Sequence, residues 1–484
     1  MATAAAIDPR QPTGLLFDAG FEHPNADLVV RSPHSGEELA RVATGTPADV
    51  DRAVRIALGH LPAPPPAGRA AVLERASRLI AERAEPLART IAAEAGKPIR
   101  QARAEAARAV DTFTFAAVAA RQLAGEVVPM ESSSAGVGKV ALTLREPVGV
   151  VGAISPFNFP LNLVAHKLAP AIAAGCPIVL KPAEATPLSA LALAGILLEA
   201  GLPPGALTVV TGSGSVVGRA IVDHPDVAMI SFTGSAPVGW DIRARAPRKH
   251  VALELGNSTP VIVTADADIE HAAARIAGSA FTHAGQSCIS VQRVYVERPV
   301  HGRLLQALVP RVEALVVGDP MEEETDVGPV ITLEARERVL TWIGEAVEAG
   351  ARIVTGGDTL EGILRPTVVD GLRPEMRLSC EEAFGPVVGI AAYDTPDEAV
   401  ELANGSPFGL QAGIFTGRVD RALRLAEGLR FGGVVINETP TFRADQMPYG
   451  GVKDSGNTRE GPAFAVRSMT EPKLVVVDLP DGEA

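Results

Sequence analysis

The stretch PVGVVGAISPFNFP at residues 147–160, together with the segment that follows it to residue 182, decides the fold of this chain. Gly149–Ile154 is apolar throughout and predicts a buried strand, Asn162–Ala174 predicts a helix, and Ile178–Lys181 predicts the next strand. Apolar strands that alternate with helices indicate a doubly wound parallel sheet, which binds its ligand at the carboxyl ends of the strands. The pattern continues with strands at Leu207–Thr211, Ala228–Phe232 and Val251–Leu255, and with helices at Leu188–Ala200, Val216–Asp223 and Pro237–Ala246.

A second α/β series follows, and helical stretches precede the first. The second series predicts strands at Pro260–Thr264, Val291–Val296, Ile353–Thr355, Val387–Tyr393, Gln411–Thr416 and Val434–Asn437, and helices at Val300–Val316, Leu333–Ala349, Asp397–Ala403 and Asp420–Leu429. The amphipathic stretches that open the chain are Ala48–Leu61, Gly68–Ala95 and Ile99–Leu123. The strand-like segments Lys139–Arg145 and Lys473–Leu479 have no other obvious partner, which suggests an arm exchanged between copies of the chain.

Size, charge and cysteine content limit the class of protein. A chain of 484 residues is too long for one ordinary core, and its net charge of −13 disfavours nucleic acid or an anionic membrane as a partner. No apolar run reaches the ~20 residues of a spanning helix, and Met1–Gly14 lacks the features of a signal peptide. Three cysteines make neither a disulfide framework nor a metal site, so we expect a cytoplasmic protein without a metal.

Three polar residues suggest covalent chemistry on an acyl group. Cys288 ends the polar turn FTHAGQSC (281–288), where a thiol can ionise and attack an electrophile. Glu254 interrupts an apolar run, and Asn158 lies in SPFNFP (155–160), so a candidate base and a candidate oxyanion donor accompany the nucleophile. Taken singly, each residue has another interpretation: a small buried hydrophobe, a strand-end carboxylate held by backbone donors, and a helix cap.

These residues lie in seven blocks that resemble the aldehyde dehydrogenase superfamily, in order and in separation, over nearly the whole chain. The resemblance implies an α/β, aldehyde-dehydrogenase-like fold with a doubly wound NAD-binding domain (residues 1–125 and 148–255), an α/β catalytic domain (256–455) and a small oligomerisation arm (126–147 and 465–484). A homodimer or homotetramer is implied as well. The blocks are residues 147–160, VLKPAE (179–184), SFTGS (231–235), LELG (253–256), GQSC (285–288), EEAFGPV (381–387) and PYGGVKDSG (448–456).

The same resemblance assigns the catalytic roles in the oxidation of an aldehyde to its carboxylic acid with NAD(P)⁺. Cys288 attacks the aldehyde, Asn158 and the Cys288 N–H stabilise the oxyanion, and Glu254 activates the water that hydrolyses the thioester. Lys167 supports the proton path or the cofactor, unless it is a surface charge. His283 is an alternative base, unless it is an ordinary turn residue. Two rival functions stay open, a CoA-acylating dehydrogenase, which Glu254 disfavours, and a non-catalytic binding member of the fold.

The cofactor implied is NAD in preference to NADP. Lys181 and Glu184 would hold the adenosine ribose, where a carboxylate repels a 2′-phosphate and a lysine attracts it. Glu382 would bind the nicotinamide ribose and Phe384 would pack against the nicotinamide. The turn TGSGSVVG (211–218) has its third glycine one residue later than the dinucleotide fingerprint, so pyrophosphate contact passes to SFTGS. The remaining cofactor residues expected are Ser155, Pro156, Phe157, Gly214, Gly218, Phe232, Gly234, Ser235 and Leu255.

The substrate pocket departs from the family pattern. Asn257 stands where the family has glycine, and His166 stands where it has tryptophan. Arg443, Arg293 and Gln292 could reach an anionic or hydroxylated aldehyde, or the arginines could form structural ion pairs. The substrate contacts expected are Phe159, His166, Ser287, Ile289 and Arg443, and the identity of the aldehyde stays open.

Overall fold

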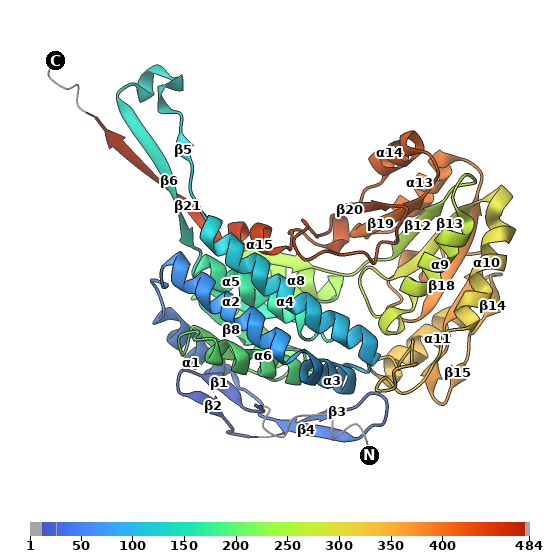
Figure 1. Cartoon of the computed structure of the whole chain (residues 1–484), viewed down its shortest axis with the longest axis horizontal. Helices are drawn as coiled ribbons and strands as arrows, with labels where there is room; N and C mark the ends of the chain where they lie inside the picture. Colours follow the sequence, from blue (N-terminus) through green and yellow to red (C-terminus); the bar gives the residue numbers. More distant parts are fainter. Residues whose placement is uncertain (1–11, 26, 480–484) are drawn as a thin grey trace.

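The computed structural model describes residues 12–25 and 27–479. Most of the Met1–Gly14 segment and the last five residues of the expected arm therefore lie outside the described residues. Two seven-stranded sheets form the two main bodies of the molecule, and a thin ribbon of strands projects from the first of them (Figure 1). The predicted α/β fold class is confirmed.

The first sheet contains the five predicted strands and two more. Its order is β11-β10-β7-β8-β9-β1-β2, and β7 to β11 run parallel. The sequence analysis missed the antiparallel edge pair β1 and β2, because three-residue strands are too short to show a period of two. The strands are β1 (Leu15–Phe17), β2 (Gly20–Glu22), β7 (Val150–Ile154), β8 (Ile178–Lys181), β9 (Leu207–Val209), β10 (Val227–Thr233) and β11 (His250–Glu254).

Helices cover both faces of this sheet, as expected of a doubly wound domain. Side chains from α2, α4, α5 and α6 form the core on one face, and side chains from α1, α7 and α8 form the core on the other. The single stretch predicted at Gly68–Ala95 is two helices that meet at Arg83. The helices are α1 (Pro47–Leu58), α2 (Pro66–Glu82), α3 (Ala84–Ala95), α4 (Ile99–Gln122), α5 (Asn162–Ala174), α6 (Leu188–Glu199), α7 (Arg219–Asp223) and α8 (Ala236–Arg245).

The second sheet has the order β14-β17-β18-β13-β12-β19-β20, and only β14 runs antiparallel to its neighbour. The six predicted strands are present, and β17 is a buried strand that the sequence analysis missed. The strands are β12 (Thr259–Val263), β13 (Val291–Glu297), β14 (Arg352–Thr355), β17 (Thr367–Asp370), β18 (Val387–Tyr393), β19 (Gln411–Phe415) and β20 (Gly433–Ile436), and the helices are α9 (Ile269–Ala280), α10 (His301–Glu313), α11 (Leu333–Glu348), α12 (Arg377–Cys380), α13 (Pro396–Asn404) and α14 (Val419–Gly428).

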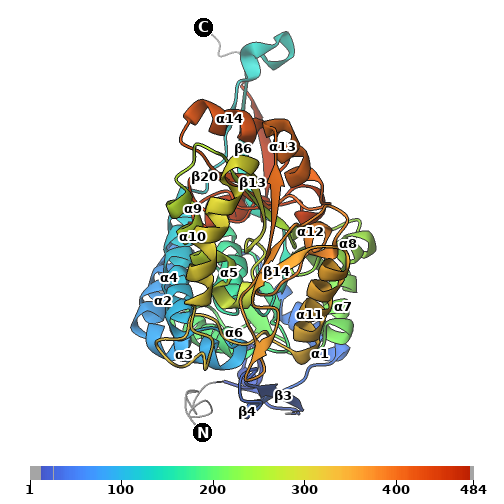
Figure 2. The same cartoon turned by 90° about the vertical axis from the view of Figure 1, so that its right-hand side faces the viewer.

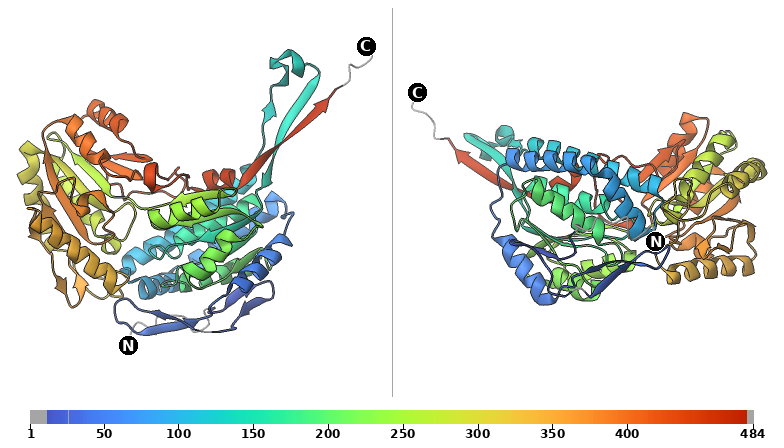
Figure 3. Two further views of the ribbon diagram at one scale, coloured as in Figure 1. Left: turned by 180° about the vertical axis from the view of Figure 1, so that it is seen from behind. Right: turned by 60° about the horizontal axis from the view of Figure 1, so that its bottom comes forward.

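The projecting ribbon is built from β6 (Lys139–Pro147) and β21 (Thr470–Asp478), with the short β5 (Val127–Val128) on the outer edge of β6. β6 and β21 pair antiparallel along their full length, and the ribbon extends well beyond the first domain (Figures 2 and 3). The helix α15 (Pro462–Ser468) precedes β21 and packs on the first domain. Within the described residues, no helix is long and apolar enough to span a membrane.

Candidate active site

Cys288 lies between two strands of the second sheet, β12 and β13, and at the edge of a cavity. The loop that carries it follows α9 and precedes β13, and its His283 and Ala284 adopt positive φ angles of 49° and 52°. Cys288 is half-buried and lines a cavity of about 320 Å³. Cys176, in contrast, is buried and donates its thiol hydrogen to the Met469 carbonyl.

The environment of Cys288 opposes ionisation, contrary to the expectation from its turn. Burial raises the pKa of the thiol to about 12, and the nearby Glu382 and Glu254 carboxyls act in the same direction. A hydrogen bond with Tyr449 and the charge of Arg443 lower the pKa. The Tyr449 hydroxyl lies 3.0 Å from Cys288 Sγ. A thiolate at this position therefore depends on the groups that surround it.

Glu254 is a buried carboxyl that no described group satisfies. It ends β11, and both of its side-chain oxygens lack a hydrogen-bond partner within residues 12–25 and 27–479. Burial, followed by the charge of Glu460, raises the pKa of Glu254 well above its usual value. The absence of a side chain at Gly450 leaves room for the carboxyl, since a Cβ there would lie 2.8 Å from Glu254 Oε1. An unsatisfied buried carboxyl with a raised pKa is typical of a functional group.

Asn158 is directed at the nucleophile loop. Its Nδ2 donates to the Gln286 carbonyl over 2.9 Å, two residues before Cys288. The helix-cap interpretation fails, because the N–H groups of Leu161 and Asn162 at the start of α5 donate to Glu105 Oε1. The amide thus lies beside the loop that carries Cys288.

Lys167 is buried and is no surface charge. Its Nζ donates to Thr233 Oγ1 over 2.7 Å and to Ser231 Oγ over 3.3 Å. Burial lowers the pKa of Lys167, while the carboxyls of Glu460 and Glu254 raise it. The lysine therefore connects electrostatically to the candidate base.

Four of the five expected substrate residues line the cavity, and His166 does not. Phe159, Ser287, Ile289 and Arg443 are among the lining residues. His166 is buried behind them, where its Nε2 lies 2.8 Å from Asp445 Oδ1 and 3.2 Å from Arg443 Nη2. His166 contacts the cavity indirectly, through Arg443 and through Asp445, the partner of Arg108.

Arg293 and Gln292 also lie away from the cavity. The Arg293 guanidinium donates to the carbonyls of Ser258, Leu402 and Ala403, so it is a structural residue. Gln292 holds the segment of the cofactor candidate Glu382, because it donates to the Glu381 carbonyl and accepts from the Ala383 N–H.

Sequence reasoning missed two residues that line the cavity, Arg108 and Tyr449, and the carboxylates Asp445 and Glu460 that pair with its arginines. Arg108 pairs with Asp445 over 2.8 Å, and Arg443 pairs with Glu460 over 2.7 Å while its guanidinium carbon stacks 3.9 Å from the Tyr449 ring centre. Tyr449 lies in the PYGGVKDSG block, which was its only signal. Arg108, Asp445 and Glu460 lie outside every block, and only the three-dimensional structure brings them together.

The expected cofactor residues gather at the carboxyl ends of the strands of the first sheet and at the facing loop of Glu382. The half-buried Glu382 accepts from the Asn257 N–H over 3.0 Å, and desolvation raises its pKa to about 7. A Cβ at Gly256 would collide with this carboxyl. The Asn257 side chain bonds Thr259 and the Gln411 carbonyl instead, so the departure from glycine leaves Glu254 unobstructed.

The residues expected to hold the ribose and the pyrophosphate lie at or after the ends of β8, β9 and β10. Glu184 is exposed and accepts from the Gly214 N–H over 3.1 Å, and Lys181 Nζ donates to the Pro182 carbonyl. Gly218 lies against Lys181 in the π-helical turn Gly214–Gly218. Further along, a Cβ at Gly234 would lie 2.6 Å from the Phe232 ring. The exposed Ser235 is the N-cap residue of α8, and Leu255 packs against that helix. The Ser155 hydroxyl has no hydrogen-bond partner among the described residues. Phe157, which follows Pro156, contacts the Phe384 ring edge-on.

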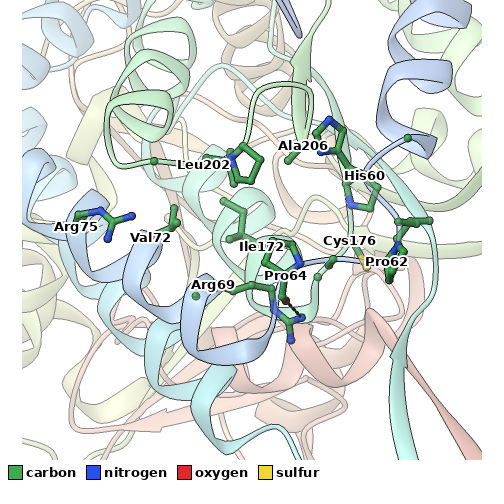
Figure 4. A pocket seen from close by; sticks show the side chains of 18 residues that line it. His60, Pro62, Pro64, Arg69, Val72, Arg75, Ile172, Cys176, Leu202 and Ala206 are labelled. Atoms are coloured by element: carbon green, nitrogen blue, oxygen red, sulfur yellow. Dashed lines mark hydrogen bonds between the residues drawn. The ribbon is translucent and has the colours of Figure 1, made fainter.

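A second cavity, of about 650 Å³, lies elsewhere, between the amino-terminal half of α2 and the ends of α5 and α6 (Figure 4). The two arginines that line it donate hydrogen bonds to carbonyls at the ends of helices. Arg69 donates to the Ala173 carbonyl and Arg75 to the Ala200 carbonyl. This cavity is separate from the Cys288 site.

The loop after β7 of the doubly wound domain contacts the loop that carries Cys288. This arrangement fits an oxidoreductase that binds a cofactor at the strand ends and its substrate covalently on the cysteine sulfur. The aldehyde dehydrogenase family model matches residues 21–475, and the chain belongs to this family. It therefore oxidises an aldehyde to the acid with a nicotinamide cofactor, through the family's cysteine chemistry.

Three similar proteins carry informative names. A "3-sulfolactaldehyde dehydrogenase" of Priestia aryabhattai is 44% identical over 96% of this chain and 98% of its own. The structure of aldehyde dehydrogenase 21 from Physcomitrella patens, in complex with the reaction product succinate, is 38% identical with a TM-score of 0.95, covering 99% and 100%. Glyceraldehyde-3-phosphate dehydrogenase from Methanocaldococcus jannaschii, complexed with NADP, is 38% identical with a TM-score of 0.90, covering 94% and 100%.

Proposed function

We propose that this enzyme oxidises a small aldehyde that carries an anionic group. The charge of the cavity beside Cys288 carries this proposal. Four cationic side chains line it against the single carboxylate of Glu105, although the protein as a whole has a net charge of −13. The acidic partners of three of these cations (Asp445, Glu460 and Glu438) are not among the lining residues. The four cations are Lys97, Arg108, Arg275 and Arg443.

The names of the similar proteins support the same substrate class. Sulfolactaldehyde carries a sulfonate, the aldehyde that yields succinate carries a carboxylate, and glyceraldehyde 3-phosphate carries a phosphate. The three aldehydes share a short chain with a charged end. A 44% identical relative makes 3-sulfolactaldehyde the first compound to test.

In the mechanism we propose, Cys288 attacks the aldehyde carbon, and the Asn158 amide and the Cys288 N–H hold the oxyanion. Bound NAD(P)⁺ supplies the acceptor for the hydride that leaves this carbon. The resulting thioester is hydrolysed by a water from which the Glu254 carboxylate removes a proton, and the charge of Lys167 favours the ionised form of Glu254 that accepts it. Glu254 favours water over CoA as the final acceptor.

NAD is the proposed cofactor in preference to NADP. Glu184 supports this preference, since it lies exposed at the ribose edge with one oxygen on the Gly214 N–H. A 2′-phosphate placed there meets a carboxylate, whereas a free 2′-hydroxyl can donate to it. Lys181 lies close by and moderates the preference.

We also propose the three-part organisation given by the sequence, with residues 126–147 and 465–484 as an oligomerisation arm. The arm exposes Val140, Leu144, Leu474 and Val476, and a ribbon of this kind is only marginally stable in isolation. A homodimer or homotetramer would cover it, and light scattering would detect either.

Three free cysteines favour a reducing, cytoplasmic location.

The substrate class is tested by comparing 3-sulfolactaldehyde and succinic semialdehyde with neutral aldehydes of similar length. We expect kcat/KM for the anionic aldehydes to be higher, and to fall with added salt. Arg108→Gln should lower it about ten- to a hundredfold, as expected for a lost charged hydrogen bond, and should spare the neutral aldehydes. Arg121→Gln, which removes an exposed cation from the same helix, is the matched control. Equal efficiencies for charged and neutral aldehydes in the wild type would refute the proposal.

A further inference from the structure

Tyr449 touches the reactive sulfur, and neither the sequence analysis nor the proposed function gives it a role. The chain has three tyrosines, and Tyr449 alone has its hydroxyl beside a cysteine, 3.0 Å from Cys288 Sγ. Its ring is buried with Ile289 and Leu410, which fixes the direction of the hydroxyl.

The charges around Cys288 show why such a donor is needed. The carboxyls of Glu382 and Glu254 reach the thiol from two different elements, and both disfavour a thiolate. Burial disfavours it further, and raises the pKa of the thiol to about 12. Tyr449 and Arg443, which lie on one loop after β20, are the groups that act in the opposite direction.

Arg443 is stacked on Tyr449. Its guanidinium carbon lies 3.9 Å from the ring centre, and the charge over the ring makes the hydroxyl a stronger donor. Glu460 and His166 hold the guanidinium in place through Nη2, and its Nε is buried without a partner among the described residues. The stack is therefore a fixed arrangement.

We propose that the Tyr449 hydroxyl, with the Arg443 guanidinium stacked on its ring, donates a hydrogen bond to the Cys288 thiolate and so activates the nucleophile. Tyr449 is then a catalytic residue, because it contacts the reacting atom. The proposal rests on the proposed role of Cys288. No bond is formed or broken by Tyr449, and the thiol proton leaves to solvent or to a nearby base.

The test is the pH dependence of Cys288 alkylation by iodoacetamide in the full-length enzyme, followed by mass spectrometry of the Cys288 peptide. Tyr449→Phe keeps the ring, its packing and the stack, and removes only the oxygen. We expect the midpoint of the profile to move to higher pH, with alkylation about ten- to a hundredfold slower below the midpoint. Tyr393→Phe, which removes a buried hydroxyl bonded to the Val263 carbonyl, should leave the profile unchanged.

Three outcomes would contradict one claim or the other. An unchanged profile in folded Tyr449→Phe, or a midpoint moved to lower pH, would overturn the role of Tyr449 and leave Cys288 as the nucleophile. Loss of activity that follows alkylation of Cys380 instead of Cys288 would overturn the proposed nucleophile itself. Thermal unfolding of both tyrosine variants establishes that each is folded.

Discussion

Replacing Glu254 by glutamine should separate the two halves of the reaction. Hydride leaves the substrate before Glu254 is required, so the first turnover proceeds and the thioester accumulates. We expect a burst of about one NADH per active site, followed by a steady state lowered about 10²- to 10⁴-fold, the usual contribution of a general base.

The same substitution should change stability in a direction set by the environment of Glu254. The folded-state pKa of Glu254 is raised by burial and by Glu460, so the protonated carboxyl favours the folded state. That contribution is complete below pH ~4.5 and is lost as the pH rises through the folded pKa. Glutamine cannot ionise, so at alkaline pH the variant should be more stable than the wild type and melt at a higher temperature. The gain in the free energy of unfolding should be ~1.4 kcal/mol for each unit by which the pKa of Glu254 is raised. In acid the two proteins should be equally stable.

The assays are rapid mixing at 340 nm, mass spectrometry of the quenched protein for the Cys288 adduct, and thermal unfolding over a pH series. Glu94→Gln is a matched control, because Glu94 is a buried carboxyl whose pKa burial raises to about 7, bonded to Ser189 at the start of α6 and away from the cavity. An undiminished steady state in Glu254→Gln would move the base elsewhere. The absence of a burst would show that Glu254 acts before hydride transfer.

Three further outcomes are expected. Cys288→Ala should abolish oxidation while Cys176→Ala and Cys380→Ala retain it, and activity in Cys288→Ala would disprove the nucleophile. The wild type should favour NAD over NADP at least about tenfold in kcat/KM, and Glu184→Ser should narrow the gap mainly by improving NADP, as measured at saturating aldehyde. Arg443 holds the pKa of Glu460 at about 2 despite burial, so this carboxyl stabilises the fold above pH ~4.5 and loses that effect as the pH falls toward 2. Glu460→Gln should therefore show a smaller loss of melting temperature in acid than the wild type.

Local sequence signals predicted the elements that carry the reaction. The strands β7, β8, β10 and β11 are mostly apolar, and the polar site candidates Ser155, Lys181 and Glu254 lie at or just after their ends. The loop of Cys288 is likewise a short contiguous block. Where a residue's role depends on its immediate neighbours in the chain, a single sequence is enough to place it.

Contacts between distant segments could not be predicted in this way. Tyr449 and Cys288 are 161 residues apart, and Arg108 and Asp445 are 337 residues apart. Neither pair has a periodic or compositional signal. His166 does not line the cavity, and its place on α5 gave no sign that its side chain contacts Asp445 and Arg443 instead.

The position of Arg443 also determines where the anionic group of the substrate should bind. Arg443 is almost fully buried and stacks on Tyr449, and its charge lowers the pKa of the Cys288 thiol. An anion bound directly to Arg443 would offset this charge and would lie near the thiolate, so it would disfavour ionisation of Cys288. Arg108 has more than a quarter of its side chain exposed and is tied to Asp445 instead. An anion there is bound without opposing the nucleophile. We therefore expect Arg108→Gln to act mainly on KM for charged aldehydes, while changes at Arg443 act on kcat for charged and neutral aldehydes alike.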